Sequence, residues 1–196
     1  RSRRQRQMCI RDSFTALAVA VAEHDRTGFT TLVAGASRVC VVVTAAVGTG
    51  LAAAAPPIAL VFAQQDPLPL ERALTAYAPG VVGFGLVALL SRALYASQHG
   101  RRAAAAQVAG WLVVMVCAVV LVWALPTDWI IAGLGTAATV GLSLAAALLC
   151  AGVAGAHGRA ALHGLGRSLA AAVLGGLAGG TLGRALAGRM APEGVA

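Results

Sequence analysis

The sequence predicts an all-α, polytopic transmembrane helix bundle with about five full membrane-spanning helices and one partial N-terminal helix. The first observation is composition: 59% of the residues are hydrophobic and 11% are charged, whereas soluble domains carry about 25% charged residues. The second is that uncharged runs recur at lengths near the ~20 residues that a helix needs to cross a hydrocarbon layer of ~30 Å. The third is that arginines stand between these runs. Together they argue against a water-soluble fold.

The membrane domain is placed at residues 14–190, between two tails. Residues 1–13 (RSRRQRQMCIRDS) are polar and lack periodicity, so we expect a non-native or disordered tail there. Residues 14–22 are apolar but too few to cross a membrane, which predicts the last turns of a partial helix. A polar loop is expected at residues 23–30, and residues 191–196 form the second tail.

Each full span follows from one uncharged run. The first run covers residues 39–65, and Pro56 with Pro57 should kink its outer third, because proline lacks an N–H and its ring clashes with the preceding turn. The second run, residues 73–91, lies between two arginines. The predicted spans, in chain order, are residues 36–63, 72–96, 103–126, 129–155 and 163–187.

The third and fourth spans are joined by a tight turn at Asp128, which Trp123 and Trp129 flank. Tryptophan is enriched at membrane interfaces, so we expect both side chains to act as membrane-interface anchors in an aromatic belt. The last span contains overlapping pairs of small residues: Gly175 with Gly179, Gly176 with Gly180, and Gly179 with Gly183. Such pairs let helices approach closely, although the abundance of Gly and Ala alone would also produce them.

The arginines give the bundle an orientation. Alternating spans place seven arginines after residue 13 on one side: Arg26, Arg38, Arg92, Arg101, Arg102, Arg159 and Arg167. The other side carries only three arginines, together with four acidic residues. The positive-inside rule therefore assigns the first side to the cytoplasm. Four of its arginines are expected to be membrane-interface anchors: Arg38, Arg92, Arg101 and Arg102.

Chemical motifs are scarce. The net charge of +8 does not indicate nucleic-acid binding, because the arginines punctuate apolar runs and do not form a basic face with aromatic or polar readers. The four cysteines are scattered, and no phosphate-binding loop, dinucleotide fingerprint or metal-ligand spacing is present. We therefore predict no catalytic residue, metal or cofactor. No charge lies in the middle of a full span, where substrate pathways are usually marked, so substrate-binding residues stay unassigned.

Residues 71–102 (ERALTAYAPGVVGFGLVALLSRALYASQHGRR) are the most distinctive stretch. They resemble the tenth-helix region of the MurJ (MviN) lipid II flippases, which belong to the multidrug/oligosaccharidyl-lipid/polysaccharide (MOP) exporter superfamily. The matching positions are Ala73, Leu74, Tyr77, Gly80, Arg92, Tyr95 and Ala96. Leu94 replaces the usual phenylalanine, and alanines at 103–106 stand where the family commonly has Thr-Pro. The resemblance extends over most of residues 14–188 and is most specific over roughly 30–100.

The resemblance implies part of a MOP-flippase C-terminal lobe, from the end of helix eight to helix thirteen, truncated at both ends. It implies a multi-pass transporter, and not an enzyme, that moves undecaprenyl-linked peptidoglycan precursor (lipid II) across the bacterial cytoplasmic membrane for cell-wall synthesis. The implied partners are lipid II, membrane lipids and the remaining helices of the full-length transporter, which carry the family's cavity arginines. On this interpretation the chain alone does not transport. The exclusive use of Arg, with heavy Ala and Gly, suggests a high-GC actinobacterium.

Three alternatives stay open. One is another polysaccharide or oligosaccharidyl-lipid flippase of the same superfamily, which would share the helix layout but lack the RALYA ending. Another is a membrane enzyme acting on polyprenyl phosphates, although the acidic residues Asp66, Glu71 and Asp128 lie on the side opposite a cytosolic donor. The last is a purely structural membrane bundle.

Overall fold

The computed structural model describes residues 26–190, and all regular secondary structure within them is helical. Five helical segments of this part are long and apolar enough to cross a membrane: Thr27–Phe62, Leu68–Ala96, Gly100–Ala124, Thr127–His157 and Arg159–Gly183. The prediction of an all-α polytopic bundle is therefore confirmed for the described residues. The predicted partial helix at residues 14–22 lies outside them.

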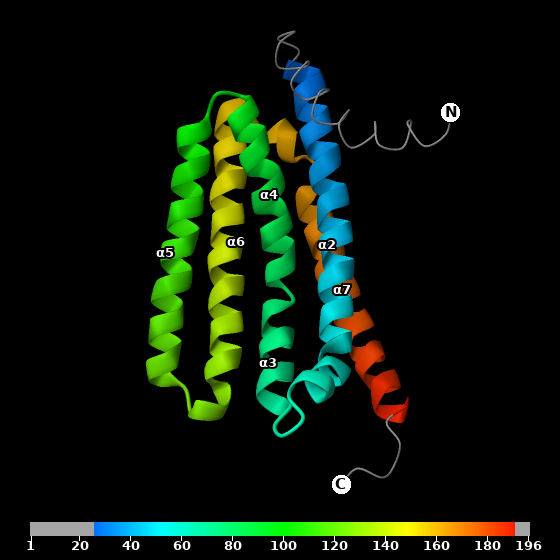
Figure 1. The fold of residues 1–196 in the computed structure, drawn as a ribbon. Helices are drawn as coiled ribbons and strands as arrows, with labels where there is room; N and C mark the ends of the chain where they lie inside the picture. Colours follow the sequence, from blue (N-terminus) through cyan, green and yellow to red (C-terminus); the bar gives the residue numbers. More distant parts are fainter. Residues whose placement is uncertain (1–25, 191–196) are drawn as a thin grey trace, which may run out of the picture.

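The membrane crossings run alternately up and down along the bundle, and α3 and α4 follow one another in the same direction (Figure 1). In chain order they are α2 (Arg26–Phe62), α3 (Leu68–Tyr77), α4 (Gly80–Ala96), α5 (Gly100–Ala124), α6 (Ile130–His157) and α7 (Leu165–Met190), with short 3₁₀ turns η1 (Thr127–Trp129) and η2 (Arg159–Leu162). Helix α6 packs against α3, α4 and α5, whereas α7 packs against α2. The central helix of the bundle is therefore α6.

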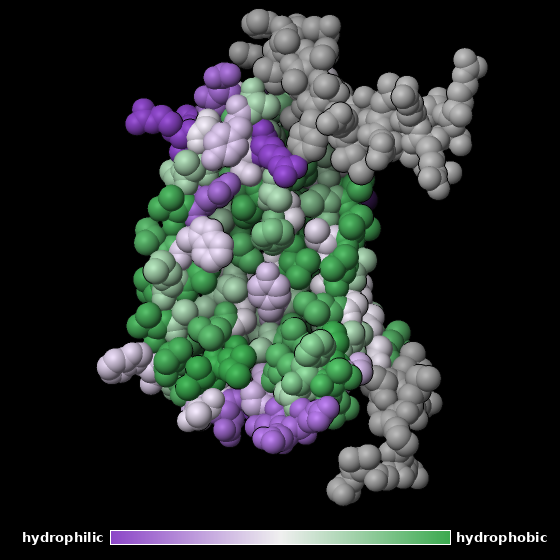
Figure 2. All heavy atoms as spheres, in the orientation of Figure 1, coloured by the Kyte–Doolittle hydropathy of each residue, from purple (hydrophilic) through white to green (hydrophobic). Residues whose placement is uncertain are grey.

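The connecting loops segregate by charge. One end, called here the arginine-rich end, holds the loops between α4 and α5 and between α6 and α7 (Figure 1). The opposite end holds the loops between α2 and α3 and between α5 and α6. Figure 2 shows hydrophilic residues gathered at both ends and a broad hydrophobic band between them. This band matches a bilayer, because a membrane protein exposes apolar side chains to lipid.

The best-buried side chains lie where α2, α4 and α6 meet. Leu90 and Leu94 of α4 and Leu149 and Val153 of α6 are fully buried, and they share one cluster with Val33 of α2. The outward faces are apolar too, with α5 exposing a row of large side chains: Trp111, Leu112, Met115, Val116, Val119 and Val120. Hydrophobicity alone therefore does not distinguish inside from outside in this bundle.

Helix α2 begins earlier than expected: a loop was predicted at residues 23–30, and the described part of it, residues 26–30, is helical. The hydroxyls of Thr30 and Thr31 both donate to the Thr27 carbonyl, at 3.0 and 2.8 Å. Their polarity is satisfied within the helix, so it does not interrupt it. Phe29 is buried with 2% of its surface exposed, and its packing gives this first turn a tertiary reason to form.

Two proline sites behave differently. Helix α2 continues through Pro56 and Pro57 to Phe62, and its last turns bend toward α3 (Figure 1). At Pro79, in contrast, the predicted span at residues 72–96 is split into α3 and α4, which follow one another at Ala78–Pro79. Pro79 has no N–H to offer the preceding turn. The second membrane crossing is therefore a broken helix.

Candidate functional site

The predicted interface anchors separate to the two ends of the bundle. Arg38, Arg92, Arg101 and Arg102 lie at or near the arginine-rich end, and all four side chains are exposed. The Arg38 Nε donates to the Ala34 carbonyl at 3.2 Å, and its side chain crosses Gly164, where an added Cβ would lie 3.1 Å from the Arg38 Cδ. Gly164 also has φ +81°, which favours glycine.

An aromatic cluster fastens three segments together at the same end. The rings of Phe29 and His157 have centroids 4.5 Å apart, and those of His99 and His157 are 6.0 Å apart in an edge-on arrangement. The His99 Nδ1 lies 2.7 Å from the Ser97 carbonyl oxygen. The start of α2, the loop before α5 and the end of α6 are therefore tied together. Sequence reasoning did not predict this contact.

The two tryptophans at the opposite end have different surroundings. Trp123 is 88% exposed, which suits a side chain at a membrane interface, whereas Trp129 is 47% exposed. The guanidinium carbon of Arg72 lies 4.2 Å from the centroid of the Trp129 ring system, within the distance of a cation–π interaction. Trp129 therefore pairs with a residue of α3 that sequence reasoning treated only as a topology charge.

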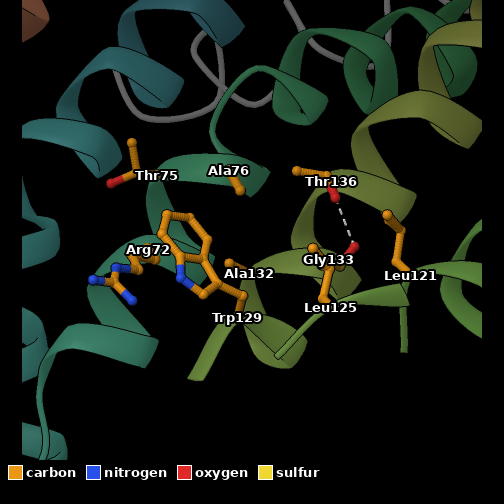
Figure 3. A pocket seen from close by; sticks show the side chains of 9 residues that line it. All are labelled: Arg72, Thr75, Ala76, Leu121, Leu125, Trp129, Ala132, Gly133 and Thr136. Atoms are coloured by element: carbon orange, nitrogen blue, oxygen red, sulfur yellow. Dashed lines mark hydrogen bonds between the residues drawn. The ribbon is translucent and has the colours of Figure 1, made fainter. Parts of the chain in front are cut away.

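This pair stands beside a crevice of about 480 Å³, called here the outer crevice, between α3, α5 and α6. Figure 3 shows Arg72 on one side of the Trp129 indole, and Leu121 and Leu125 on the other side. The lining residues are Arg72, Thr75, Ala76, Leu121, Leu125, Trp129, Ala132, Gly133 and Thr136. Arg72 is the only charged member of this set. Gly133 lets the Leu125 side chain approach α6 closely, because a Cβ there would lie 2.9 Å from the Leu125 Cδ1.

Both threonines of the outer crevice use their hydroxyl hydrogens within their own helices. The Thr136 hydroxyl donates to the Gly133 carbonyl at 2.7 Å (Figure 3), and the Thr75 hydroxyl donates to the Glu71 carbonyl at 2.9 Å. A ligand in the crevice therefore meets mainly methyl groups, an indole and, at one side, a guanidinium.

The break between α3 and α4 lies next to this crevice. The Thr139 hydroxyl of α6 donates to the Ala76 carbonyl at 2.7 Å. In an unbroken helix that carbonyl would accept from the N–H of Gly80. A side chain of the neighbouring helix thus satisfies a carbonyl at the break, which is the usual way that a membrane helix tolerates proline.

Glycines let the neighbouring backbones reach the break. A Cβ at Gly48 of α2 would lie 2.6 Å from the Ala78 carbonyl oxygen, and one at Gly135 of α6 would lie 2.7 Å from the Ala73 carbonyl oxygen. Within the described residues, no group of three or more His, Cys, Asp or Glu could hold a metal ion.

Comparison with known proteins gives the family. A family model described as "Lipid II flippase MurJ" matches residues 13–187. Comparisons with curated proteins and with solved structures gave no match. The matched range contains α2 to α6 and most of α7, so it includes every described helix that could cross a membrane. The chain therefore belongs to the MurJ lipid II flippase family.

Proposed function

We propose that this chain acts, with the remaining helices of the transporter, in moving lipid II from the inner to the outer leaflet of the bacterial cytoplasmic membrane. It would do so as a transporter and not as an enzyme. The observation that carries the proposal is the family match over residues 13–187, because members of this family are lipid II flippases. The long apolar helices support a membrane location.

The packing of α4, α5 and α6 supports a mechanical role for them. Alternating access moves one helix bundle against another, largely as a rigid body. Here a Cβ at Gly83 of α4 would lie 3.0 Å from the Leu142 carbonyl carbon, and one at Gly110 of α5 would lie 2.6 Å from the Ala145 Cβ. These three helices are in backbone-level contact, which leaves little room for sliding. They would therefore move together.

The arginine-rich end would face the cytoplasm. Arg38, Arg92, Arg101 and Arg102 would then lie at the leaflet whose anionic lipids attract basic residues. Trp123 and Trp129 would mark the outer interface. The charge asymmetry between the two ends supports this orientation, and labelling of single cysteines placed in the two sets of loops would test it.

Depletion of the protein in its own cells tests the proposal. Lipid II should accumulate in the inner leaflet, and cleavage of outward-facing lipid II by a membrane-impermeant hydrolase should fall. Re-expression of the wild-type protein should restore cleavage. Loss of another surface polysaccharide, with outward-facing lipid II unchanged, would contradict the proposal and favour a different cargo of the superfamily.

A further inference from the structure

We propose that the outer crevice binds a membrane glycerophospholipid, with the phosphate on Arg72 and one acyl chain in the crevice. This inference concerns a lipid of the surrounding bilayer and not the transported cargo, so it goes beyond the proposed function. It rests on the charge and polarity of the lining residues and on their position at one end of the hydrophobic band.

Arg72 is arranged to receive an anion. The Arg72 guanidinium carbon lies over the Trp129 ring, 4.2 Å from its centroid, and this cation–π contact uses none of the five N–H donors of the guanidinium. Among the described residues, no carboxylate forms an ion pair with Arg72. The Trp129 ring therefore holds the Arg72 guanidinium in place, and the N–H groups of the guanidinium can donate to phosphate oxygens.

The rest of the outer crevice suits hydrocarbon. Leu121, Leu125, Ala76 and Ala132 supply apolar walls, and the two threonine hydroxyls donate to backbone carbonyls. The volume of about 480 Å³ falls within the ~300–1,000 Å³ usual for ligand pockets. An uncharged solute would leave Arg72 unused, and a free phosphate would leave the apolar walls unused. An amphiphile with one anionic group and a chain uses both.

The position of the crevice selects the source of that amphiphile. It lies at the end that carries Trp123 and Trp129, where the aromatic residues of a membrane protein meet the headgroup layer. A phosphodiester carries one negative charge, which one arginine can balance. A polyprenyl diphosphate carries more negative charge than the single cation of this crevice can neutralise. The site therefore fits a glycerophospholipid better than a diphosphate carrier lipid.

Photo-crosslinking on the purified full chain tests this assignment. The probe is phosphatidylglycerol with a diazirine on one acyl chain, presented in mixed micelles, and labelled peptides are mapped. Label should concentrate on α5 and α6 around Leu121, Leu125 and Gly133. Diacylglycerol with the same chain should label this region several-fold less, because it lacks the phosphate.

Variants separate the charge from the cavity. Arg72→Gln should lower crevice labelling by about fivefold, which corresponds to ~1 kcal/mol per basic residue near a lipid surface. The matched control Arg101→Gln removes an exposed arginine from the arginine-rich end and should leave crevice labelling unchanged. Leu125→Trp should fill the crevice and abolish its label while Arg72 is kept. If Arg72→Gln does not fold, the result for Leu125→Trp decides.

Several results would overturn the proposal. One is equal crevice labelling of the wild type and the folded Arg72→Gln variant. Another is label spread evenly around the hydrophobic band. A third is displacement of the phosphatidylglycerol probe by undecaprenyl diphosphate at lower concentration than by unlabelled phosphatidylglycerol, which would assign the crevice to the carrier lipid.

Discussion

Helices α6 and α7 are both long, apolar and rich in glycine, yet they occupy opposite situations in the bundle. Helix α6 contacts α3, α4 and α5, whereas α7 lies against α2. Within an apolar 18-residue stretch of each crossing, 33% of the residues are buried in Thr127–His157, which contains α6, and 6% are buried in Arg159–Gly183, which contains most of α7. Leu165 at the start of α7 is buried, but Val173, Leu174, Leu177 and Leu182 farther along the helix are exposed.

The difference shows what specifies position in an apolar bundle. Lipid tails are as apolar as leucine, so burying leucine gains little, and close packing of small residues drives helix association instead. Helix α6 buries Gly133, Ala137, Gly141, Ala145 and Ala146. On α7, Cβ atoms at Gly176, Gly179 and Gly183 would meet α2, whereas Gly175 and Gly180 have open space around them. Which face of the helix the glycines occupy therefore determines helix packing more than how many glycines the helix has.

The largest expected effect is that of Gly141→Leu in α6. A Cβ at this position would lie 2.7 Å from the Gly110 carbonyl oxygen and 3.0 Å from the Val114 amide nitrogen. Both are backbone atoms of α5 and cannot move aside, so the seam must open and little folded protein should be recovered. The measurement is the monodisperse yield in detergent together with the melting temperature.

The matched control is Gly175→Leu in α7, which introduces the same side chain where no atom lies within 4 Å. It should leave yield and melting temperature close to the wild type. Equal losses for the two variants would show that the two helices do not differ in packing as the structure has them.

A smaller effect is expected for Gly179→Leu. A Cβ at residue 179 would lie 3.1 Å from the Thr49 Cγ2 of α2, so the added side chain would push α7 off α2. Overpacking of this kind typically costs ~1–3 kcal/mol. Because α7 is peripheral, we expect it to detach while the rest of the bundle stays folded.

A disulfide between Ala53→Cys and Gly183→Cys, in a background without native cysteines, reports the contact between α2 and α7, because a Cβ at Gly183 would lie 2.9 Å from the Ala53 Cβ. Its rate of formation should fall in the Gly179→Leu variant and stay unchanged with Gly180→Leu, which points into open space. A change in the Gly180→Leu variant as large as in Gly179→Leu would contradict the assigned face of α7.

Much of the fold could be predicted because the bilayer imposes simple constraints. Span length, uncharged runs and alternating arginines are local properties of the sequence, so the all-α bundle followed from them. The early start of α2 could not be predicted from polarity, because the hydroxyls of Thr30 and Thr31 donate to the Thr27 carbonyl within the helix and so do not interrupt it. It could also not be predicted that Pro79 would break its span, whereas α2 continues through Pro56 and Pro57.

The candidate site was harder to predict than the fold. The tight turn with Trp129 was recognised, but its partner Arg72 lies 57 positions away in the sequence, as the difference 129 − 72 shows. Nothing local links the two residues, since their contact depends on how α3 packs against α6. The weak indication available was an arginine on the side that carries few of them. The anchoring role of Arg38, Arg92, Arg101, Arg102, Trp123 and Trp129 stays a prediction.

The smallest expected effect is a loss of folding stability when a hydrogen bond between two helices is removed, compared with removal of one within a single helix. Thr139→Val removes the donor to the Ala76 carbonyl, and interhelical bonds in membranes are worth ~0.6–1.7 kcal/mol. The control, Thr181→Val in α7, removes a hydroxyl that bonds only to carbonyls of its own helix, those of Leu177 and Ala178. The free energy of unfolding, measured by denaturant titration in detergent, should fall for the first variant and change little for the second.

The same measurement in a Pro79→Ala background shows whether the break is the reason for that bond. With alanine at residue 79, α3 and α4 can join, and the N–H of Gly80 becomes available to the Ala76 carbonyl. The effect of Thr139→Val should then shrink toward that of Thr181→Val. The opposite result is that Thr139→Val lowers the free energy of unfolding as much in the Pro79→Ala background as in the wild type. Thr139 would then stabilise the contact of α6 with α3 whether or not the helix is broken, and the idea that it replaces the hydrogen bond missing at the break would be wrong.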